Sequence, residues 1–424
     1  MEYARWILAG LVAIALFLSS WIVIPAPTMA LLPLGVGAPE ISPILLLSHV
    51  ILLLLWYLLS LRLTGTETFL LASLDTLGWL ILSCSALGVI LSSLPLLQLP
   101  ATLHRAERAM VQGLGPQYVE YLENSPSAQS AGMRLARPFN LINLIRGIAI
   151  PTIAPEQHSI ATPDGATLTV DVYSPRPPSR PSTPQPILVT IYGGAWQSGN
   201  PQQKSKFNAY MAAQGYAVVA LEYRHAPDYQ FPTQINDVNT VLRWIGTHAP
   251  DYGWNRDRLA LVGWSAGGHL ALLAAYAPLL GEAEREASVT IQSVVNYYGP
   301  VDLAKGYADL PVPDPIDNRA VLETFLGGSP DQVPTAYQAA SPITYVEPGL
   351  PPTLLVYGDH DHLVKPGFGQ QLHRQLRSQG NQSVLIRLPW AEHAFDALFS
   401  GMGNQVALYH TERFLAWTLR SPSP

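Results

Sequence analysis

One serine lies in a motif whose residue types and spacing could carry nucleophilic chemistry. Ser265 belongs to the segment Gly263-Trp264-Ser265-Ala266-Gly267-Gly268, which follows the apolar run 259–262. A G-x-S-x-G pattern between a strand and a helix predicts a sharp turn, in which the serine adopts strained backbone angles and only small residues fit two positions to either side. Such a turn holds the hydroxyl at a helix N-terminus, where the N–H of Ala266 points at a developing oxyanion. An ordinary tight turn with a capping serine is the competing interpretation.

An acid and a base follow later in the chain, in the order expected for a serine on such a turn. Asp361 and His393 each come shortly after a strand-like run. A hydroxyl is a poor nucleophile at pH 7, so we expect His393 to take its proton and Asp361 to orient and stabilise the imidazole ring. Spacing alone leaves Asp359 as a rival acid and His360 or His362 as rival bases.

A glycine-containing loop supplies the remaining part of this candidate site. The segment Tyr192-Gly193-Gly194-Ala195-Trp196 follows the apolar run 187–191. Glycines let a main chain fold close to a ligand, so the N–H groups of Gly193 and Gly194 are predicted to complete an oxyanion hole with Ala266. Trp196 is expected either to shape the substrate pocket or simply to pack.

Composition excludes several other classes of site. The run 359–362 of Asp and His could suggest a metal, but the single cysteine, Cys84, and the absence of a third distant ligand motif argue against one. We therefore expect neither a metal nor an organic cofactor, and we expect His269 to be a satisfied helix histidine. With 24 Lys and Arg against 30 Asp and Glu and no basic block, no nucleic-acid partner is expected.

From about residue 156 the chain alternates strand-like and helix-like segments. Largely apolar strands between helices predict an α/β fold with a mostly parallel sheet covered on both faces, in a catalytic domain over 156–424. A Pro-rich stretch over 301–350 interrupts the alternation and is expected to form a lid or cap. The predicted strands are 166–173, 187–192, 216–223, 258–264, 293–298, 353–358 and 383–388, and the predicted helices are 203–214, 233–247, 266–279, 367–378 and 405–419.

The first hundred residues differ from the rest in composition. The whole chain is 48% hydrophobic and 13% charged, and residues 1–100 hold only six charged side chains. Three uncharged runs, 6–24, 44–61 and 76–97, approach the roughly 20 residues that a helix needs to cross a bilayer. These runs predict a multi-pass membrane region with the lipid bilayer as a partner. Buried core helices are one alternative, and a cleaved signal peptide is another for the first run, although that run is longer than the apolar core of a usual signal peptide.

Charge at the membrane edges bears on orientation. Arg5 precedes the first run, and residues 25–43 contain no Lys or Arg, which slightly favours a cytoplasmic N-terminus and a catalytic domain outside the cytoplasm. His49 and Asp75, each near the start of its run, are expected at interfaces on opposite sides of the bilayer. Residues 101–155 are predicted to be a connector. It would contain a helix over 101–114, which Pro95 and Pro100 separate from the third run. It would also contain an apolar stretch over 141–150 that either lies along the membrane surface or packs on the following domain.

These motifs together resemble the α/β-hydrolase superfamily, and within it the hormone-sensitive-lipase-like and feruloyl-esterase-like carboxylesterases. The resemblance covers about residues 156–420 and includes the segment 222–227, Glu-Tyr-Arg-His-Ala-Pro, with Phe-Pro and Asp-Val after it. The family's acid-turn pattern implies Asp361 rather than Asp359. Tyr192 stands where the family usually has histidine and Ala195 where it has a third glycine, so the loop geometry is the least certain feature that the resemblance implies.

The resemblance implies a function for the catalytic domain. We expect a membrane-anchored serine hydrolase that cleaves small-molecule or lipid-like carboxylic esters through an acyl-enzyme. The Gly-Gly-Ala-Trp loop behind membrane helices is also similar to that of prenylcysteine methylesterases, which implies a lipidated methyl ester as one candidate substrate. The alternatives are an acyltransferase with the same triad and a non-catalytic interaction protein of the same fold.

Overall fold

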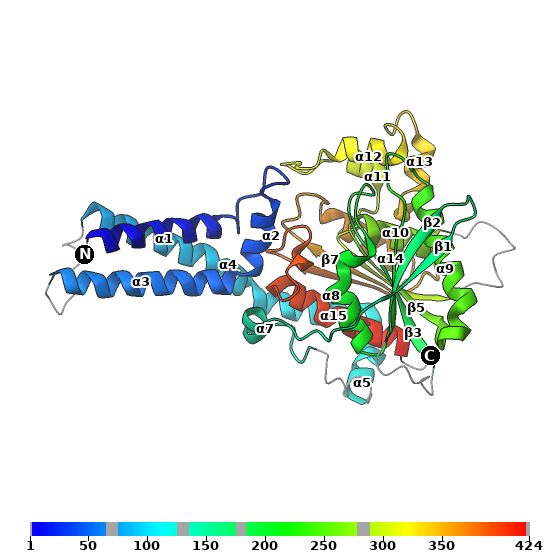
Figure 1. The fold of residues 1–424 in the computed structure, drawn as a ribbon, viewed down its shortest axis with the longest axis horizontal. Coiled ribbons are helices and arrows are strands. Elements are labelled where there is room, and N and C mark those ends of the chain that lie inside the picture. The colour runs from blue at the N-terminus through cyan, green and yellow to red at the C-terminus, as the bar shows by residue number, and fades with distance from the viewer. Residues whose placement is uncertain (1, 65–74, 125–134, 175–183, 278–288, 421–424) are drawn as a thin grey trace.

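The protein consists of a bundle of long helices joined to a domain built on one large sheet (Figure 1). The computed structural model describes residues 2–64, 75–124, 135–174, 184–277 and 289–420. The bundle contains the N-terminal segments, and the second domain contains every motif in which we expect chemistry.

Eight strands form the sheet, in the order β1-β2-β4-β3-β5-β6-β7-β8. Strand β2 pairs antiparallel with β1 and β4, and all the other neighbours are parallel. The predicted α/β class with a mostly parallel sheet is confirmed. The strands are β1 (Glu156–Ala161), β2 (Thr167–Tyr173), β3 (Gln185–Ile191), β4 (Ala217–Leu221), β5 (Trp254–Trp264), β6 (Ile291–Tyr297), β7 (Thr353–Gly358) and β8 (Ser383–Leu388).

One strand was absent from the sequence-based prediction. Only Ile160 is buried in β1, which lies at the edge of the sheet. A strand with one buried side chain lacks the alternation that a sequence pattern can detect, and its pairing with β2 depends on tertiary structure.

Helices flank the sheet, and four short ones fill the interval 301–350 (Figure 1). This interval follows β6 and precedes β7, so it lies where the carboxyl ends of the parallel strands open. The helices of this domain are η2 (Pro201–Lys204), α8 (Ser205–Ala213), α9 (Thr233–Tyr252), α10 (Ala266–Tyr276), α11 (Leu303–Ala308), α12 (Asn318–Leu326), α13 (Pro334–Ala339), η4 (Pro342–Tyr345), α14 (Gly367–Ser378), η5 (Phe395–Ala397) and α15 (Met402–Arg420).

Three helices of the bundle are long and apolar enough to cross a membrane. They are α1 (Glu2–Ser20), α3 (Ser42–Thr64) and α4 (Thr76–Leu114), and the short α2 (Leu32–Glu40) connects the first two. Less than a third of each apolar stretch is buried inside the molecule. Apolar side chains therefore cover the outside of the bundle, as they do in helices that face lipid.

The helix α4 does not end where the sequence predicts. It continues through Pro95 and Pro100 to Leu114, so the predicted break between the third apolar run and the helix 101–114 is wrong. Its second half belongs to the catalytic domain, because a Cβ on Gly113 would lie 2.6 Å from the backbone oxygen of Ser383 in β8. Packing on the sheet outweighs the cost of about 3 kcal/mol that a proline imposes inside a helix. The described part of the connector contains two further helices, α5 (Pro116–Asn124) and α7 (Leu141–Arg146).

Polar contacts mark the two ends of the bundle. Arg5 forms an ion pair with Asp75 at the end far from the sheet. At the other end the Oγ of Ser19 lies 3.0 Å from the Nε2 of His49 and 2.9 Å from the Oγ of Ser92. His49 is fully buried and turns toward the neighbouring helices rather than outward. It thus links α1, α3 and α4 where they approach the catalytic domain.

A buried carboxyl group joins the bundle to the catalytic domain. Glu40, the last residue of α2, accepts a hydrogen bond of 2.7 Å from the backbone N–H of Gly403 and a longer one from Asn404, both at the start of α15. The side chain is fully buried. Burial raises the pKa of Glu40 from 4.5 to about 8, although the two backbone N–H groups act in the opposite direction.

Replacing Glu40 with glutamine is expected to remove a pH dependence of stability. Because the raised pKa keeps a proton on the folded protein that the unfolded chain loses, the free energy of unfolding falls as pH rises from 4.5 to about 8, by up to roughly 1.4 kcal/mol per pH unit. Glutamine does not ionise and can accept the same hydrogen bonds. The variant should therefore melt at a higher temperature than the wild type at pH 9, with a difference that shrinks toward pH 5. Melting curves in detergent measure this, with the exposed Glu107→Gln as control, and parallel pH profiles for Glu40→Gln and wild type would contradict it.

Candidate active site

Ser265 occupies the sharp turn between β5 and α10. Its backbone angles are φ 53° and ψ −123°, which cost energy for any residue with a Cβ. The turn requires small neighbours, since a Cβ on Gly263 would lie 2.1 Å from the backbone oxygen of Gly267. A Cβ on Gly267 would in turn lie 2.1 Å from the backbone oxygen of Ile191 in β3. The glycines at both ends of the motif therefore allow the turn that exposes the serine.

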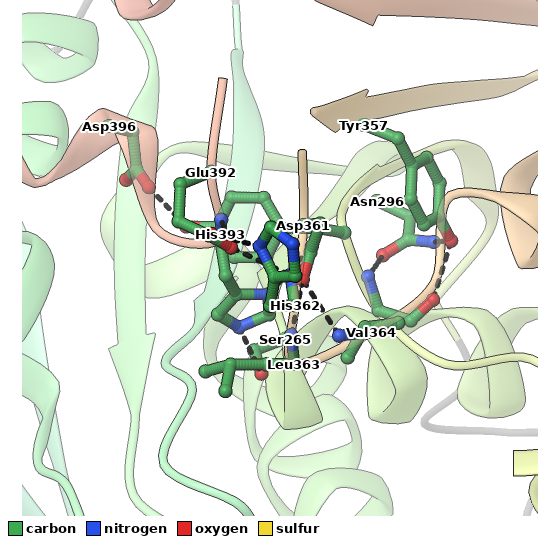
Figure 2. Close-up of polar contacts among 12 residues, drawn as sticks. Ser265, Asn296, Tyr357, Asp361, His362, Leu363, Val364, Glu392, His393 and Asp396 are labelled. Atoms are coloured by element: carbon green, nitrogen blue, oxygen red, sulfur yellow. Dashed lines mark hydrogen bonds and ion pairs between the residues drawn. The ribbon is translucent and has the colours of Figure 1, made fainter. Parts of the chain in front are cut away.

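The serine contacts the expected base, and the base in turn contacts the expected acid (Figure 2). The Oγ of Ser265 is 3.0 Å from Nε2 of His393, and Nδ1 of the same ring is 2.8 Å from Oδ2 of Asp361. The carboxylate accepts a hydrogen bond from the Nδ1–H group, which leaves the lone pair of Nε2 facing the serine hydroxyl. The sheet thus brings together three side chains that are far apart in the sequence.

Burial and backbone contacts set the properties of Asp361. Its Oδ1 accepts hydrogen bonds from the backbone N–H groups of Leu363 at 2.9 Å and Val364 at 2.7 Å. Burial raises the pKa of Asp361, while His393 and the N–H of Val364 act in the opposite direction. The carboxyl group is therefore held in one orientation, aimed at the imidazole.

The rival residues of the acid turn have other partners. Asp359 pairs with Arg387 at 2.8 Å, and His362 pairs with Glu392 at 2.5 Å. Burial lowers the pKa of His360, while the backbone of Ile22, at the end of the bundle, acts in the opposite direction. Within the described ranges, no group of three or more His, Cys, Asp or Glu side chains is arranged to hold a metal ion.

Two residues that sequence reasoning did not single out contact the histidine. The Oε1 of Glu392 accepts hydrogen bonds from the backbone N–H groups of His362 at 2.7 Å and His393 at 2.8 Å (Figure 2). The ring of Tyr298 lies 4.5 Å from that of His393, and its hydroxyl donates to Asp396. The sequence could have indicated Glu392, because this residue directly precedes His393. It offered no comparable indication for Tyr298, apart from the position of this residue after a predicted strand.

The two loop glycines and Ala266 line a cavity beside the serine. A Cβ on Gly193 would lie 2.9 Å from the Cβ of Ser265, so only glycine allows the loop to approach this closely. Gly194 has a φ of 139°, and a Cβ there would lie 2.0 Å from the backbone oxygen of Ser198. The main chain can therefore direct N–H groups toward a carbonyl bound at Ser265.

Tyr192 supports this loop from behind. Its ring stacks on that of Tyr223 with centroids 4.5 Å apart, and its hydroxyl lies 3.0 Å from Nε2 of His225. The Tyr223 hydroxyl returns a hydrogen bond of 3.2 Å to the backbone oxygen of Tyr192. A tyrosine at the position where the resembling family has histidine is thus anchored by residues of the 222–227 segment.

Trp196 and His269 connect the loop to the short helices. The Nε1–H of Trp196 donates to Nδ1 of His269 at 3.2 Å, and Nε2 of this histidine donates to the backbone oxygen of Ala340 at 2.6 Å. Burial lowers the pKa of His269 to about 4, so the ring is neutral at pH 7 with its proton on Nε2. The Trp196 ring also stacks on Phe325 of α12 at 4.2 Å.

Comparisons with known proteins agree with this fold. A family model described as BD-FAE matches residues 170–376. Esterase LipQ of Mycobacterium tuberculosis is 30% identical over 304 residues, which are 70% of this chain and 71% of LipQ. The chain belongs to the α/β-hydrolase esterases, a family of carboxylic ester hydrolases.

Another relative and a solved structure also match this chain. The probable carboxylic ester hydrolase LipM of M. tuberculosis is 34% identical, and the aligned region is 54% of each of the two chains. Among solved structures, a bacterial heroin esterase aligns with a TM-score of 0.56 and 22% identity, covering 70% of this chain and 97% of the other. The similarity to the heroin esterase shows that the two proteins share a fold.

The cavity at the serine of this esterase measures about 690 Å³. Its lining comes from several parts of the chain: the loop 193–198, η2, the serine turn, the stretch 298–322 after β6, the acid turn with α14, the histidine loop 393–397, and the connection between α1 and α3. Trp196 and the interval 301–350 were expected there, whereas the contribution of the N-terminal region was not. The apolar lining residues include Met29, Leu32, Trp196, Leu303, Pro311, Ile316, Val321, Leu322, Leu363, Val364 and Phe368.

Proposed function

We propose that this chain is a membrane-anchored serine esterase that hydrolyses carboxylic esters through an acyl-enzyme. The observation that carries the proposal is the relay from Ser265 through His393 to Asp361, with contacts of 3.0 and 2.8 Å. Its position at the floor of an apolar cavity supports an uncharged organic substrate.

The residues act in two half-reactions. In the first, His393 takes the proton of Ser265 as Oγ bonds to the ester carbonyl carbon, and the oxyanion is stabilised by the N–H groups of Gly193, Gly194 and Ala266. The imidazolium, stabilised by Asp361, then protonates the alkoxide as the ester C–O bond breaks. In the second half-reaction, water attacks the acyl-enzyme with His393 again as base, and the products are an acid and the free serine.

The bundle acts as the anchor in this proposal. Three spans put the two ends of the bundle on opposite sides of the bilayer, and Arg5 favours a cytoplasmic N-terminus, which leaves the catalytic domain outside the cytoplasm. A reporter fused to the C-terminus tests this orientation, and a signal from the cytoplasm would contradict it.

Labelling by a fluorophosphonate tests the nucleophile directly. The full-length protein in detergent should react with the probe, and peptide mass spectrometry should find the phosphonyl group on Ser265. Hydrolysis of p-nitrophenyl butyrate should be lost in step with labelling. A protein that hydrolyses the ester while its label lies on another residue would overturn the assignment.

A further inference from the structure

The cavity at Ser265 has one wall that does not belong to the catalytic domain. Met29 and Leu32 line it from the connection between α1 and α3, and Pro311 and Ile316 line it from the segment between α11 and α12. All four side chains are apolar. The cavity volume of about 690 Å³ lies within the range of about 300–1,000 Å³ that holds drug-sized ligands, and exceeds what a short acyl group needs.

This wall lies at the level where the bundle meets the catalytic domain. The chain leaves α1 at Ser20 and enters α3 at Ser42, and both helix ends are on the catalytic-domain side of the bundle (Figure 1). The connection between them also comes near the acid turn, because the backbone of Ile22 acts on the pKa of the His360 side chain. If the bundle spans a bilayer, Met29 and Leu32 therefore lie at its surface.

Exposed apolar side chains flank the cavity on both segments. Met29 is 49% exposed and Ile24 is 50% exposed on one side, and Val312 is 88% exposed on the other. The segment between α11 and α12 extends toward the bundle side of the molecule (Figure 1). Exposed apolar groups that adjoin membrane helices are covered by lipid rather than by water.

The charged residues of the lining do not oppose an apolar ligand. Lys204 is paired with Asp396, and Lys365 with Asp309, so the ammonium groups that reach the cavity each have a carboxylate partner. A neutral chain can therefore enter without leaving a charge uncompensated.

We propose that the cavity opens sideways to the bilayer and that Met29 and Leu32 form the wall that accepts the long apolar chain of a membrane-resident ester. This inference rests on the proposed esterase function and names its substrate class. The ester group reaches Ser265 while its chain lies between the α1–α3 connection and the α11–α12 segment.

Filling this wall should change the preference for chain length. In full-length protein reconstituted in phosphatidylcholine vesicles, Met29→Trp should lower the ratio of kcat/KM for esters with a chain of about 12 carbons to kcat/KM for p-nitrophenyl acetate at least tenfold. Two substrate series are needed, because the long chain could belong to the acyl or to the alcohol part of the ester. They are p-nitrophenyl esters of increasing acyl length and alkyl butyrates of increasing alcohol length. The matched control is Ile142→Trp, which adds the same ring at an exposed apolar residue of α7 that does not line the cavity.

A charge at the opening tests entry from the bilayer. Val312→Glu should reduce hydrolysis of a long-chain ester dissolved in the vesicle at least tenfold, with soluble acetate hydrolysis preserved. The inference would be overturned if Met29→Trp lost activity toward long-chain esters in neither substrate series. It would also be overturned if both variants lost activity equally toward long and short esters. Either result would leave the esterase proposal standing. A wild-type protein that hydrolyses no ester would overturn the proposed function and this inference with it.

Discussion

Replacing Ser265 with alanine is expected to lower kcat for p-nitrophenyl butyrate by about 10⁶-fold with little change in KM. Loss of the nucleophile from a hydrolase triad has an effect of this size because the remaining residues cannot form the covalent intermediate. A residual rate about 10³-fold above that in water should persist, since the N–H groups of Gly193, Gly194 and Ala266 still stabilise an oxyanion. Steady-state kinetics of the purified protein in detergent measure the change.

The control for this variant is another serine-to-alanine change. Ser159 is exposed on the edge strand β1, far from the relay, and Ser159→Ala should retain wild-type kinetics. A Ser265→Ala protein that keeps more than about one hundredth of the wild-type kcat would show that a different group attacks the ester. A triad that loses its nucleophile loses far more of its kcat than this.

Replacing Asp361 with asparagine is expected to lower kcat by about 10⁴-fold. An amide in place of the carboxylate can donate to Nδ1 of His393, which favours the tautomer with its proton on Nε2 and removes the base that faces Ser265. The folded structure should survive, because asparagine retains an oxygen that can accept from the N–H groups of Leu363 and Val364. The kcat for p-nitrophenyl butyrate, with circular dichroism as a check on folding, measures the effect.

Asp359→Asn is the matched control, since the same change is made two residues away. The contact of Asp359 with Arg387 is a partly exposed ion pair, of the kind that contributes about 0–1 kcal/mol to stability, and does not involve His393. Activity within about twofold of wild type is expected. Near-normal kcat in Asp361→Asn together with a large loss in Asp359→Asn would reverse the assignment of the acid.

Much of the catalytic domain could be predicted because its local patterns agree with its fold. The predicted bounds of β7, α14 and β8 coincide with those in the structure, and each of these segments has strong periodicity or a continuous apolar run. Predictions failed where local signal and packing disagree. The edge strand β1 has one buried residue, and α4 passes two prolines because its second half packs on β8.

Local sequence could indicate some residues of the proposed site but not others. The sharp turn at Ser265 has a local cause, since its glycines are the residues that fit the close backbone contacts. The choice of Asp361 over Asp359 came from a family resemblance, because spacing in the chain does not say which carboxylate faces a histidine thirty residues later. Glu392 and Tyr298 depend on contacts across strands and were not assigned a role.

The sequence alone determined that this chain combines an apolar, nearly uncharged N-terminal region with an α/β domain that contains a serine elbow, an acid turn and a late histidine. These are properties of composition and local pattern, which depend on near neighbours in the chain. Only the tertiary structure decided that Glu40 enters the catalytic domain and that Met29 and Leu32 form a wall of its cavity, and it placed Asp361 rather than Asp359 against His393. Those contacts join residues that are tens to hundreds of positions apart, and packing of the whole sheet and bundle sets their geometry.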